Sequence, residues 1–205
     1  MIYEVRTYRL KPNTGPEVVK RFGEAYEKRK KYSELAAFFT TDIGPLNQII
    51  HIWPYKDLNE RAKIRAESVK DGTWPPKIAE FCEEQLSEIY HPFAITPEFK
   101  PGKVGPIFEW RSYTLVAGQL PRVMENWSKA VPERTKRSPL TMAMHTDLGP
   151  LNRFVHIWPY KDLNERAAVR SQAVKDGIWP PKGGEGTLVA QENKICIPAS
   201  FSPLQ

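Results

Sequence analysis

Residues 41–77 read TDIGPLNQIIHIWPYKDLNERAKIRAESVKDGTWPPK, and residues 146–182 read TDLGPLNRFVHIWPYKDLNERAAVRSQAVKDGIWPPK. The two stretches are identical at 27 of 37 positions, without a gap, at an offset of 105 residues. An earlier pair has the same offset, with EVRTYRL at 4–10 and EWRSYTL at 109–115. The chain therefore contains a duplicated unit. We predict two domains, 1–95 and 107–205, joined by a linker over 96–106 that contains three prolines and two glycines.

Each copy predicts the order β-α-β-β-α-β. In the first copy, alternating residues indicate strands over 2–10, 35–41, 47–55 and 87–93. Capping-box pairs, Thr14 with Glu17 and Asp57 with Glu60, predict where the two helices begin. This order is the ferredoxin-like unit, so the fold class is α+β. In the second copy, Pro132 is expected to shorten or kink the first helix, and residues 183–186 are expected to form a loop.

One face of the predicted sheets is preserved in both copies and is polar and aromatic at once. We call it the polar-aromatic face; it consists of Glu4, Arg6, Tyr8, Asn47, His51, Trp53 and Tyr55, and of Glu109, Arg111, Tyr113, Asn152, His156, Trp158 and Tyr160. The opposite face of 48–55 is aliphatic and suits packing under helices. Exposed aromatic groups promote association. We therefore predict that the polar-aromatic faces cover each other inside a closed intramolecular barrel.

The stretches YEVRTYRLKP and GPLNQIIHIWPYKDLNERAKIR resemble the NIPSNAP family, over most of 2–93 and again over about 107–182. The resemblance implies the dimeric α/β-barrel fold, in which ferredoxin-like units pair sheet to sheet. It does not imply a particular reaction, although relatives in the superfamily include monooxygenases, isomerases and haem-handling enzymes. Animal members are associated with mitochondria and protein partners. No presequence is visible here, so we expect a cytoplasmic protein.

His51 and His156 are the histidines shared by the copies, and we consider them as candidate general acids or bases. The alternative is that they are buried and hydrogen-bonded to a partner such as Glu4 or Tyr8. Arg6 could hold a ligand carboxylate, or Glu4 and Arg6 could neutralise each other. Trp53 and Tyr55 could stack on a planar ligand or pack in the core. The remaining members of the polar-aromatic face are predicted to line the same ligand-binding chamber.

Several classes of function lack sequence support. The chain has no Gly-rich phosphate loop, HExxH motif or nucleophile elbow, and no haem motif accompanies its histidines. Its two cysteines favour neither a metal site nor a disulfide framework. The net charge of +6 is spread along the chain, which argues against nucleic acid, and no apolar run predicts a membrane span. We predict no cofactor and a small organic ligand bound in the barrel interior, with acid/base, monooxygenase or isomerase chemistry as options. The alternative is a non-catalytic adaptor or scaffold with a protein partner, or a homo-oligomer.

Overall fold

The computed structural model describes residues 1–72 and 74–205, in which the predicted order of elements occurs twice. The first repeat comprises β1 (Ile2–Leu10), α1 (Gly15–Arg29), β2 (Ala37–Ile43), β3 (Gln48–Tyr55), α2 (Leu58–Lys70), the short 3-10 helix η1 (Ala79–Phe81) and β4 (Cys82–Pro92). The second comprises β5 (Ile107–Leu115), α3 (Leu120–Thr135), β6 (Met142–Leu148), β7 (Arg153–Tyr160), α4 (Leu163–Lys175) and β8 (Leu188–Pro198). The α+β ferredoxin-like prediction is confirmed.

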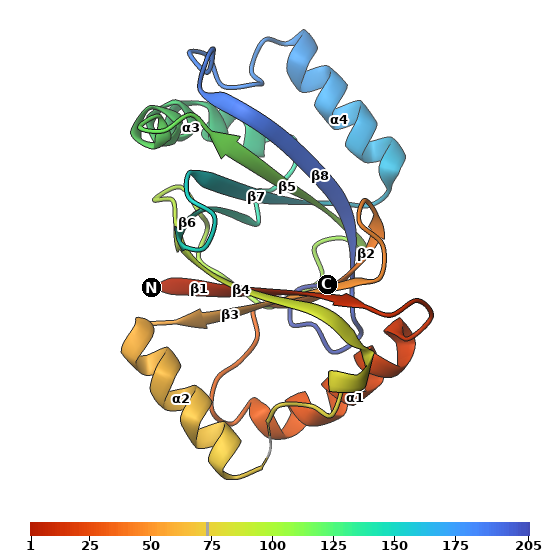
Figure 1. Ribbon diagram of the computed structural model, residues 1–205. Helices are drawn as coiled ribbons and strands as arrows, with labels where there is room; N and C mark the ends of the chain where they lie inside the picture. Colours follow the sequence, from red (N-terminus) through yellow and green to blue (C-terminus); the bar gives the residue numbers. More distant parts are fainter. Residues whose placement is uncertain (73) are drawn as a thin grey trace.

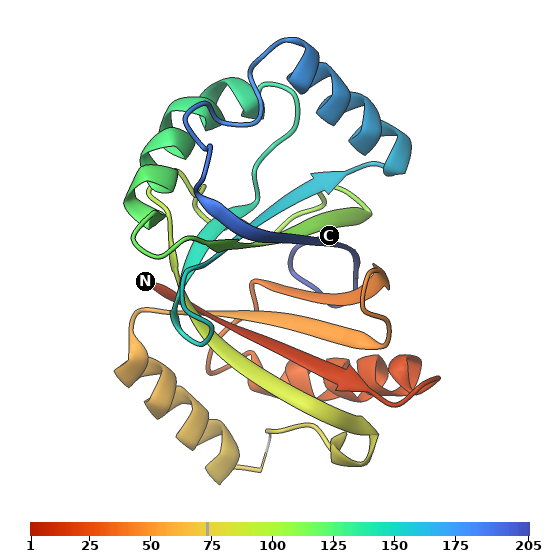
Figure 2. The ribbon, with the colours of Figure 1, turned by 45° about the horizontal axis from the view of Figure 1, so that its top comes forward.

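The eight strands form one closed barrel with the order β1-β3-β2-β8-β5-β7-β6-β4. Each repeat contributes a four-stranded antiparallel sheet, and the sheets are joined where β2 pairs with β8 and β4 pairs with β6. Both ribbon views show the two sheets facing each other, with α1 and α2 outside one sheet and α3 and α4 outside the other (Figures 1 and 2). Closure removes the exposed edges that two separate sheets would have.

The faces of the sheets are the reverse of the prediction. An apolar cluster fills the barrel interior; its members include Tyr3, Val5, Ile50 and Ile52 from the first repeat and Phe108, Trp110, Val155 and Ile157 from the second. The polar-aromatic face lies outside the barrel, beneath the helices. The prediction that the polar-aromatic face lines a chamber inside the barrel is therefore wrong for its members on the strands. These are Glu4, Arg6, Tyr8, His51, Trp53, Tyr55, Glu109, Arg111, Tyr113, His156, Trp158 and Tyr160.

Charge explains why the polar-aromatic face turns outward. The interior of an eight-stranded barrel is just wide enough for side chains to fill it, and ions buried away from water carry a penalty of several kcal/mol each. Beneath the helices, Glu4 meets Arg61 of α2, whose side chain is 25% exposed. The charged groups thus pair with one another and keep a route to water, while the aliphatic face forms the dry interior.

Helix starts agree with the predictions in α2 but not in α1. Asp57 accepts a hydrogen bond from the Glu60 backbone N–H at 2.9 Å, and the Glu60 carboxylate accepts one from Lys56 N–H at 2.5 Å. Thr14 caps no N–H of α1 with its side chain, because its hydroxyl donates to the Lys11 carbonyl instead. Pro132 does not shorten α3, which spans 16 residues against 15 for α1.

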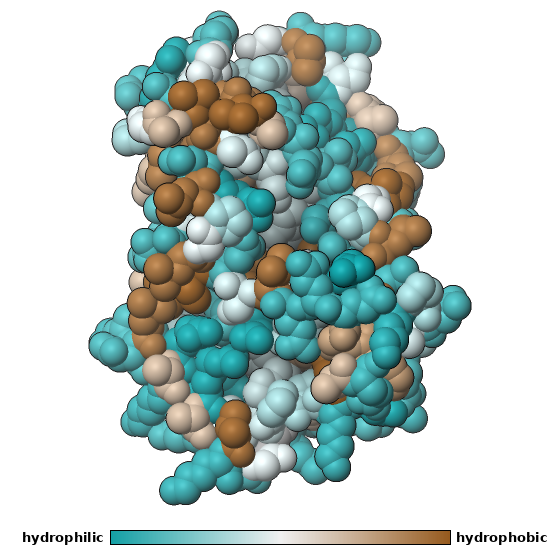
Figure 3. All heavy atoms as spheres, viewed as in Figure 1, coloured by the Kyte–Doolittle hydropathy of each residue, from teal (hydrophilic) through white to brown (hydrophobic). Residues whose placement is uncertain are grey.

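The face of the molecule in Figure 3 carries mainly hydrophilic side chains, with groups of apolar side chains between them. Among the described residues, no helix is long and apolar enough to span a membrane. Cys82 and Cys196 are free thiols. Away from the chain ends, the most exposed apolar residues include Leu46, which is 63% exposed, and Leu151, which is 74% exposed. Both lie in the repeated GPLN turns.

Candidate functional site

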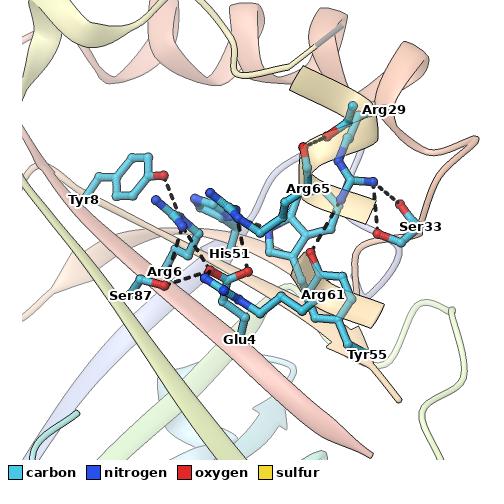
Figure 4. A network of polar contacts seen from close by, with 12 residues as sticks. Glu4, Arg6, Tyr8, Arg29, Ser33, His51, Tyr55, Arg61, Arg65 and Ser87 are labelled. Atoms are coloured by element: carbon cyan, nitrogen blue, oxygen red, sulfur yellow. Dashed lines mark hydrogen bonds and ion pairs between the residues drawn. The ribbon is translucent and has the colours of Figure 1, made fainter. Parts of the chain in front are cut away.

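A buried carboxylate at the centre of a guanidinium cluster anchors the polar-aromatic face of the first repeat (Figure 4). The Glu4 Oε1 atom accepts hydrogen bonds from Arg6 Nη1 at 2.9 Å, Arg61 Nη2 at 2.7 Å and Ser87 Oγ at 2.7 Å. Arg65 Nη1 lies 3.7 Å from the second oxygen, Oε2. The cluster therefore joins β1, β4 and α2 through one side chain.

The second repeat preserves this arrangement with small changes. Glu109 pairs with Arg111 at 2.8 Å, with Arg166 at 2.5 Å and, through its other oxygen, with Arg170 at 3.3 Å. Burial by itself raises the pKa of Glu109, but the hydrogen bond from Arg166 and the charge of Arg170 outweigh it and lower the pKa. Each repeat thus holds three guanidinium groups around one carboxylate, which leaves an excess of positive charge.

Ion pairs and a helix cap define the roles of the charged residues in and beside this cluster. Glu4 and Arg6 do neutralise each other, as one of the alternatives proposed. Asp57 caps α2, and Arg61, one helical turn further on, turns toward Glu4.

The two shared histidines are completely enclosed. Trp53 Nε1 donates a hydrogen bond to His51 Nδ1 at 2.6 Å, and Trp158 does the same to His156 at 2.7 Å. The neutral imidazoles therefore carry their proton on Nε2, and this atom has no hydrogen-bond partner among the described residues in either repeat. The predicted partners Glu4 and Tyr8 are thus replaced by tryptophan.

Burial, with a further contribution from Arg6, lowers the pKa of His51 well below its ordinary value, and burial together with Arg111 does the same for the pKa of His156. A neutral imidazole whose free lone pair already accepts a hydrogen bond is poorly placed to take a proton from a ligand. The geometry favours the structural alternative for both histidines over acid–base catalysis.

These histidines predict acid sensitivity. Below about pH 6.5 an unfolded chain protonates its histidines, whereas the folded chain keeps His51 and His156 neutral, so stability is present above that pH and lost below it. We expect each to contribute at most about 1.4 kcal/mol per pH unit to this loss. Urea unfolding between about pH 7 and 5.5 measures it. His51→Gln should remove part of the pH dependence, and the remainder should come from His156 and from His145, whose pKa burial also lowers. An unchanged dependence in His51→Gln would contradict the assignment.

Trp53 and Tyr55 pack in the core around a buried cation. The Arg29 guanidinium of α1 lies 4.7 Å from the centre of the Trp53 ring and 5.9 Å from that of Trp74, and it donates to the Tyr55 hydroxyl at 3.5 Å. The second repeat has the same arrangement with Arg134, Trp158, Trp179 and Tyr160. These contacts support the core-packing alternative for the two conserved aromatic pairs.

Asn47 and Asn152 are separated from the rest of the polar-aromatic face. Each is an exposed turn residue in the left-handed region, with φ of 56°, immediately before a strand. Their carbonyl groups accept hydrogen bonds from Leu10 and Leu115 N–H. Asparagine is favoured here because it tolerates this backbone conformation, and the structure does not bring it to the cluster.

A cavity of about 390 Å³ opens beside the cluster of the second repeat, between the sheet, α3, α4 and the loop after Pro181. Its polar lining includes Arg111, Tyr113, Arg170, Glu185 and Gln191, and its apolar lining includes Val123, Trp127, Phe154, Val174, Trp179 and Leu188. Three other cavities, of about 390–440 Å³, have no polar-aromatic face residue in their linings. The cavity is within the usual size of small-molecule sites.

The loop sequence explains why the second repeat is open. The Thr187 N–H donates to the Gly184 carbonyl, just as Phe81 N–H donates to the Ile78 carbonyl, so Gly184 corresponds to Ile78 and Thr187 to Phe81. Ile78 is buried in the core of the first repeat and Phe81 packs against it, whereas Gly184 and Thr187 line the cavity. The predicted loop over 183–186 is confirmed and is the main difference between the two sites.

Arg21 adds a second difference. In the first repeat its guanidinium bonds to the Lys77 carbonyl and Glu80, and lies 4.8 Å from the centre of the Phe81 ring. The equivalent residue of α3 is the shorter Asn126, which donates to the Gly183 carbonyl. Tyr8 is accordingly only 7% exposed, while Tyr113 is partly exposed at the cavity wall.

Arg170, Trp127, Trp179 and Gly184 were not among the predicted site residues. Arg170 and Trp179 belong to the repeated stretch, which was the available signal; Trp127 and Gly184 differ between copies and carried none. Among the residues that the structure describes, no group of three or more His, Cys, Asp or Glu side chains is placed to hold a metal ion.

Known proteins resemble the chain in both sequence and fold. The NIPSNAP family model matches residues 3–97 and again 108–203. The human Protein NipSnap homolog 3A is 29% identical over 100% of this chain and 86% of its own length, and the mouse Protein NipSnap homolog 3B is 30% identical over 99% and 85%. A candidate monooxygenase from Lactobacillus acidophilus, 11% identical, superposes with a TM-score of 0.70 over 97% of this chain and 94% of that one. This last likeness concerns the fold alone.

Proposed function

We propose that this chain, which belongs to the NIPSNAP family, binds a small organic anion in the cavity of its second repeat. The observation that carries the proposal is the pairing of Arg111 and Arg170 with an aromatic wall in one cavity of about 390 Å³. Guanidinium groups hold carboxylates through charge-assisted hydrogen bonds, and tryptophan rings provide apolar contact area at little conformational cost. The location replaces the barrel interior, where apolar side chains form the core.

The electrostatics support an anion rather than a cation. Arg111 and Arg170 share Glu109 with Arg166, and the cavity lining also contains Glu185, so three guanidinium groups are set against two carboxylates. The Arg170 side chain is 32% exposed and donates one hydrogen bond, at 3.3 Å, to Glu109 among the described residues, so most of its donors are free for a ligand. An incoming carboxylate would use these donors without displacing Glu109.

Naphthoate is a suitable probe because it joins a carboxylate to a flat apolar body. We expect titration calorimetry to detect binding to the wild type and no comparable binding of naphthalenemethanol, its uncharged analogue. Arg170→Ala should weaken naphthoate binding about 10- to 100-fold, which is the usual effect of losing a charged hydrogen bond. Arg65→Ala, the equivalent change in the first repeat, is the matched control and should leave the affinity unchanged.

Two results would overturn the proposal: no binding of naphthoate to the wild type, or equal loss in Arg65→Ala and Arg170→Ala. The first would favour the adaptor or scaffold alternative. The exposed Leu46 and Leu151 at the hairpin tips would then be the residues to test for protein contacts.

A further inference from the structure

The polar end of the second-repeat cavity offers a second donor beside the arginines. Tyr113 Oη accepts a hydrogen bond from Arg111 Nε at 2.8 Å, so its own O–H must point elsewhere. Within residues 1–72 and 74–205, no acceptor for this O–H is found, and Tyr113 lines the cavity. A phenol that already accepts from a guanidinium is a strengthened donor, because hydrogen bonds in a chain polarise one another.

The donors of this end are close together. Arg111 Nη1 and Arg170 Nη1 bond to the two oxygens of the same carboxylate, Glu109, at 2.8 and 3.3 Å. The Tyr113 hydroxyl lies 2.8 Å from another nitrogen of Arg111. A guanidinium often binds both oxygens of a carboxylate at once. A ligand carboxylate held in this way by Arg170 has no oxygen left for Tyr113, so a ligand that also accepts from Tyr113 needs a further oxygen beside its carboxylate.

The rest of the cavity is apolar and shaped by flat groups. The Trp127 and Trp179 rings meet edge to face with their centres 4.8 Å apart, and Trp127 meets Phe154 in the same way at 4.6 Å. All three rings line the cavity, and aromatic side chains suit an aromatic ligand body in stacked or edge-on contact.

We propose that the ligand of this site is a 2-oxo carboxylic acid with an aromatic body. The carboxylate binds Arg170, the adjacent 2-oxo oxygen accepts the O–H of Tyr113, and the ring packs on Trp127 and Trp179. This assignment rests on the anion-binding function proposed above and adds the class of anion. Tyr113 is the residue that distinguishes a 2-oxo acid from a simple acid, because a simple acid whose two oxygens are both held by Arg170 has no further acceptor for the Tyr113 O–H.

Phenylpyruvate and hydrocinnamate test the assignment, since they differ only in the 2-oxo group. Calorimetry on the wild type should show phenylpyruvate binding about tenfold more tightly, the effect of one hydrogen bond to a polarised donor. Tyr113→Phe should remove this preference by weakening phenylpyruvate about tenfold and leaving hydrocinnamate unchanged. Tyr8→Phe, the same substitution in the first repeat, should preserve the preference.

Equal affinities of the two acids for the wild type would overturn the assignment, and so would a preference that survives in Tyr113→Phe. The wild-type comparison requires no variant, so it stands even if Tyr113→Phe fails to fold. If naphthoate binds but the 2-oxo preference is absent, only the 2-oxo assignment fails. If naphthoate and both phenyl acids fail to bind, the anion site itself is lost.

Discussion

Replacing Glu4 by Gln is expected to lower the free energy of unfolding by about 3–5 kcal/mol at neutral pH, as is usual when one partner of a buried ion pair is removed. Glu4 is completely buried and bonds to Arg6, Arg61 and Ser87 through one oxygen. The neutral amide would keep the shape of the side chain but leave the guanidinium groups facing one another without a counter-charge. Urea unfolding of the wild type and the variant measures the difference.

The effect of Glu4→Gln should depend on pH in a specified direction. Burial raises the pKa of Glu4, but hydrogen bonds from Arg61 and Ser87 and the charges of Arg65 and Arg6 outweigh it and bring the pKa to about 2. The folded-state pKa is thus below that of the unfolded chain, so the stabilisation is fully present above about pH 4.5 and is lost as the pH falls toward 2. The wild type and the variant should converge over this range.

Glu83→Gln provides the matched control, because Glu83 pairs with Arg9 at 2.6 Å on the same pair of strands but is exposed. Exposed ion pairs contribute about 0–1 kcal/mol, so this substitution should change stability little. A Glu4→Gln variant as stable as Glu83→Gln would show that the cluster does not hold β1 to α2.

The duplication made the barrel predictable. A repeated alternating pattern specifies the strands and their order, and it shows that one face of each sheet must pack against the other sheet. It did not specify which face turns inward. Alternation separates two faces, and aromatic residues such as Trp53 and Tyr8 pack equally well in a barrel or under a helix. The decision came from residues outside the strands: Arg61 reaches Glu4, and the Arg29 guanidinium of α1 lies over Trp53 and Trp74. Arg29 stands in a basic run, KRKK, and nothing in that run distinguishes it as buried.

The open site was also only partly predictable. Arg111 and Tyr113 were identified because the copies agree there, but agreement cannot show that one copy is open and the other closed. That difference depends on residues where the copies disagree, Gly184 against Ile78 and Thr187 against Phe81. These positions can be matched only by comparing the two loops in the structure. The sequence offset between the loops differs by one residue from the offset between the strands that precede them.

Gly184→Ile is expected to close the cavity and reduce naphthoate binding by more than about 100-fold, because a filled pocket can no longer take up the ligand. The substitution gives the second repeat the residue that the first repeat has at Ile78. The backbone of Gly184 lies outside the left-handed region, and an added Cβ atom would meet Pro181 O at 3.5 Å and Thr187 Oγ1 at 3.9 Å, which are ordinary contacts. The variant should therefore fold, and a melting temperature equal to that of the wild type would verify it.

Lys182→Ile is the control for Gly184→Ile, because it adds the same side chain to the same loop at an exposed position that does not line the cavity. Its naphthoate affinity should remain close to that of the wild type. A Gly184→Ile protein that folds and binds naphthoate normally would place the anion somewhere other than this cavity. A loss shared by both variants would point to a disturbed loop conformation, and not to filling of the space beneath Gly184, as its cause.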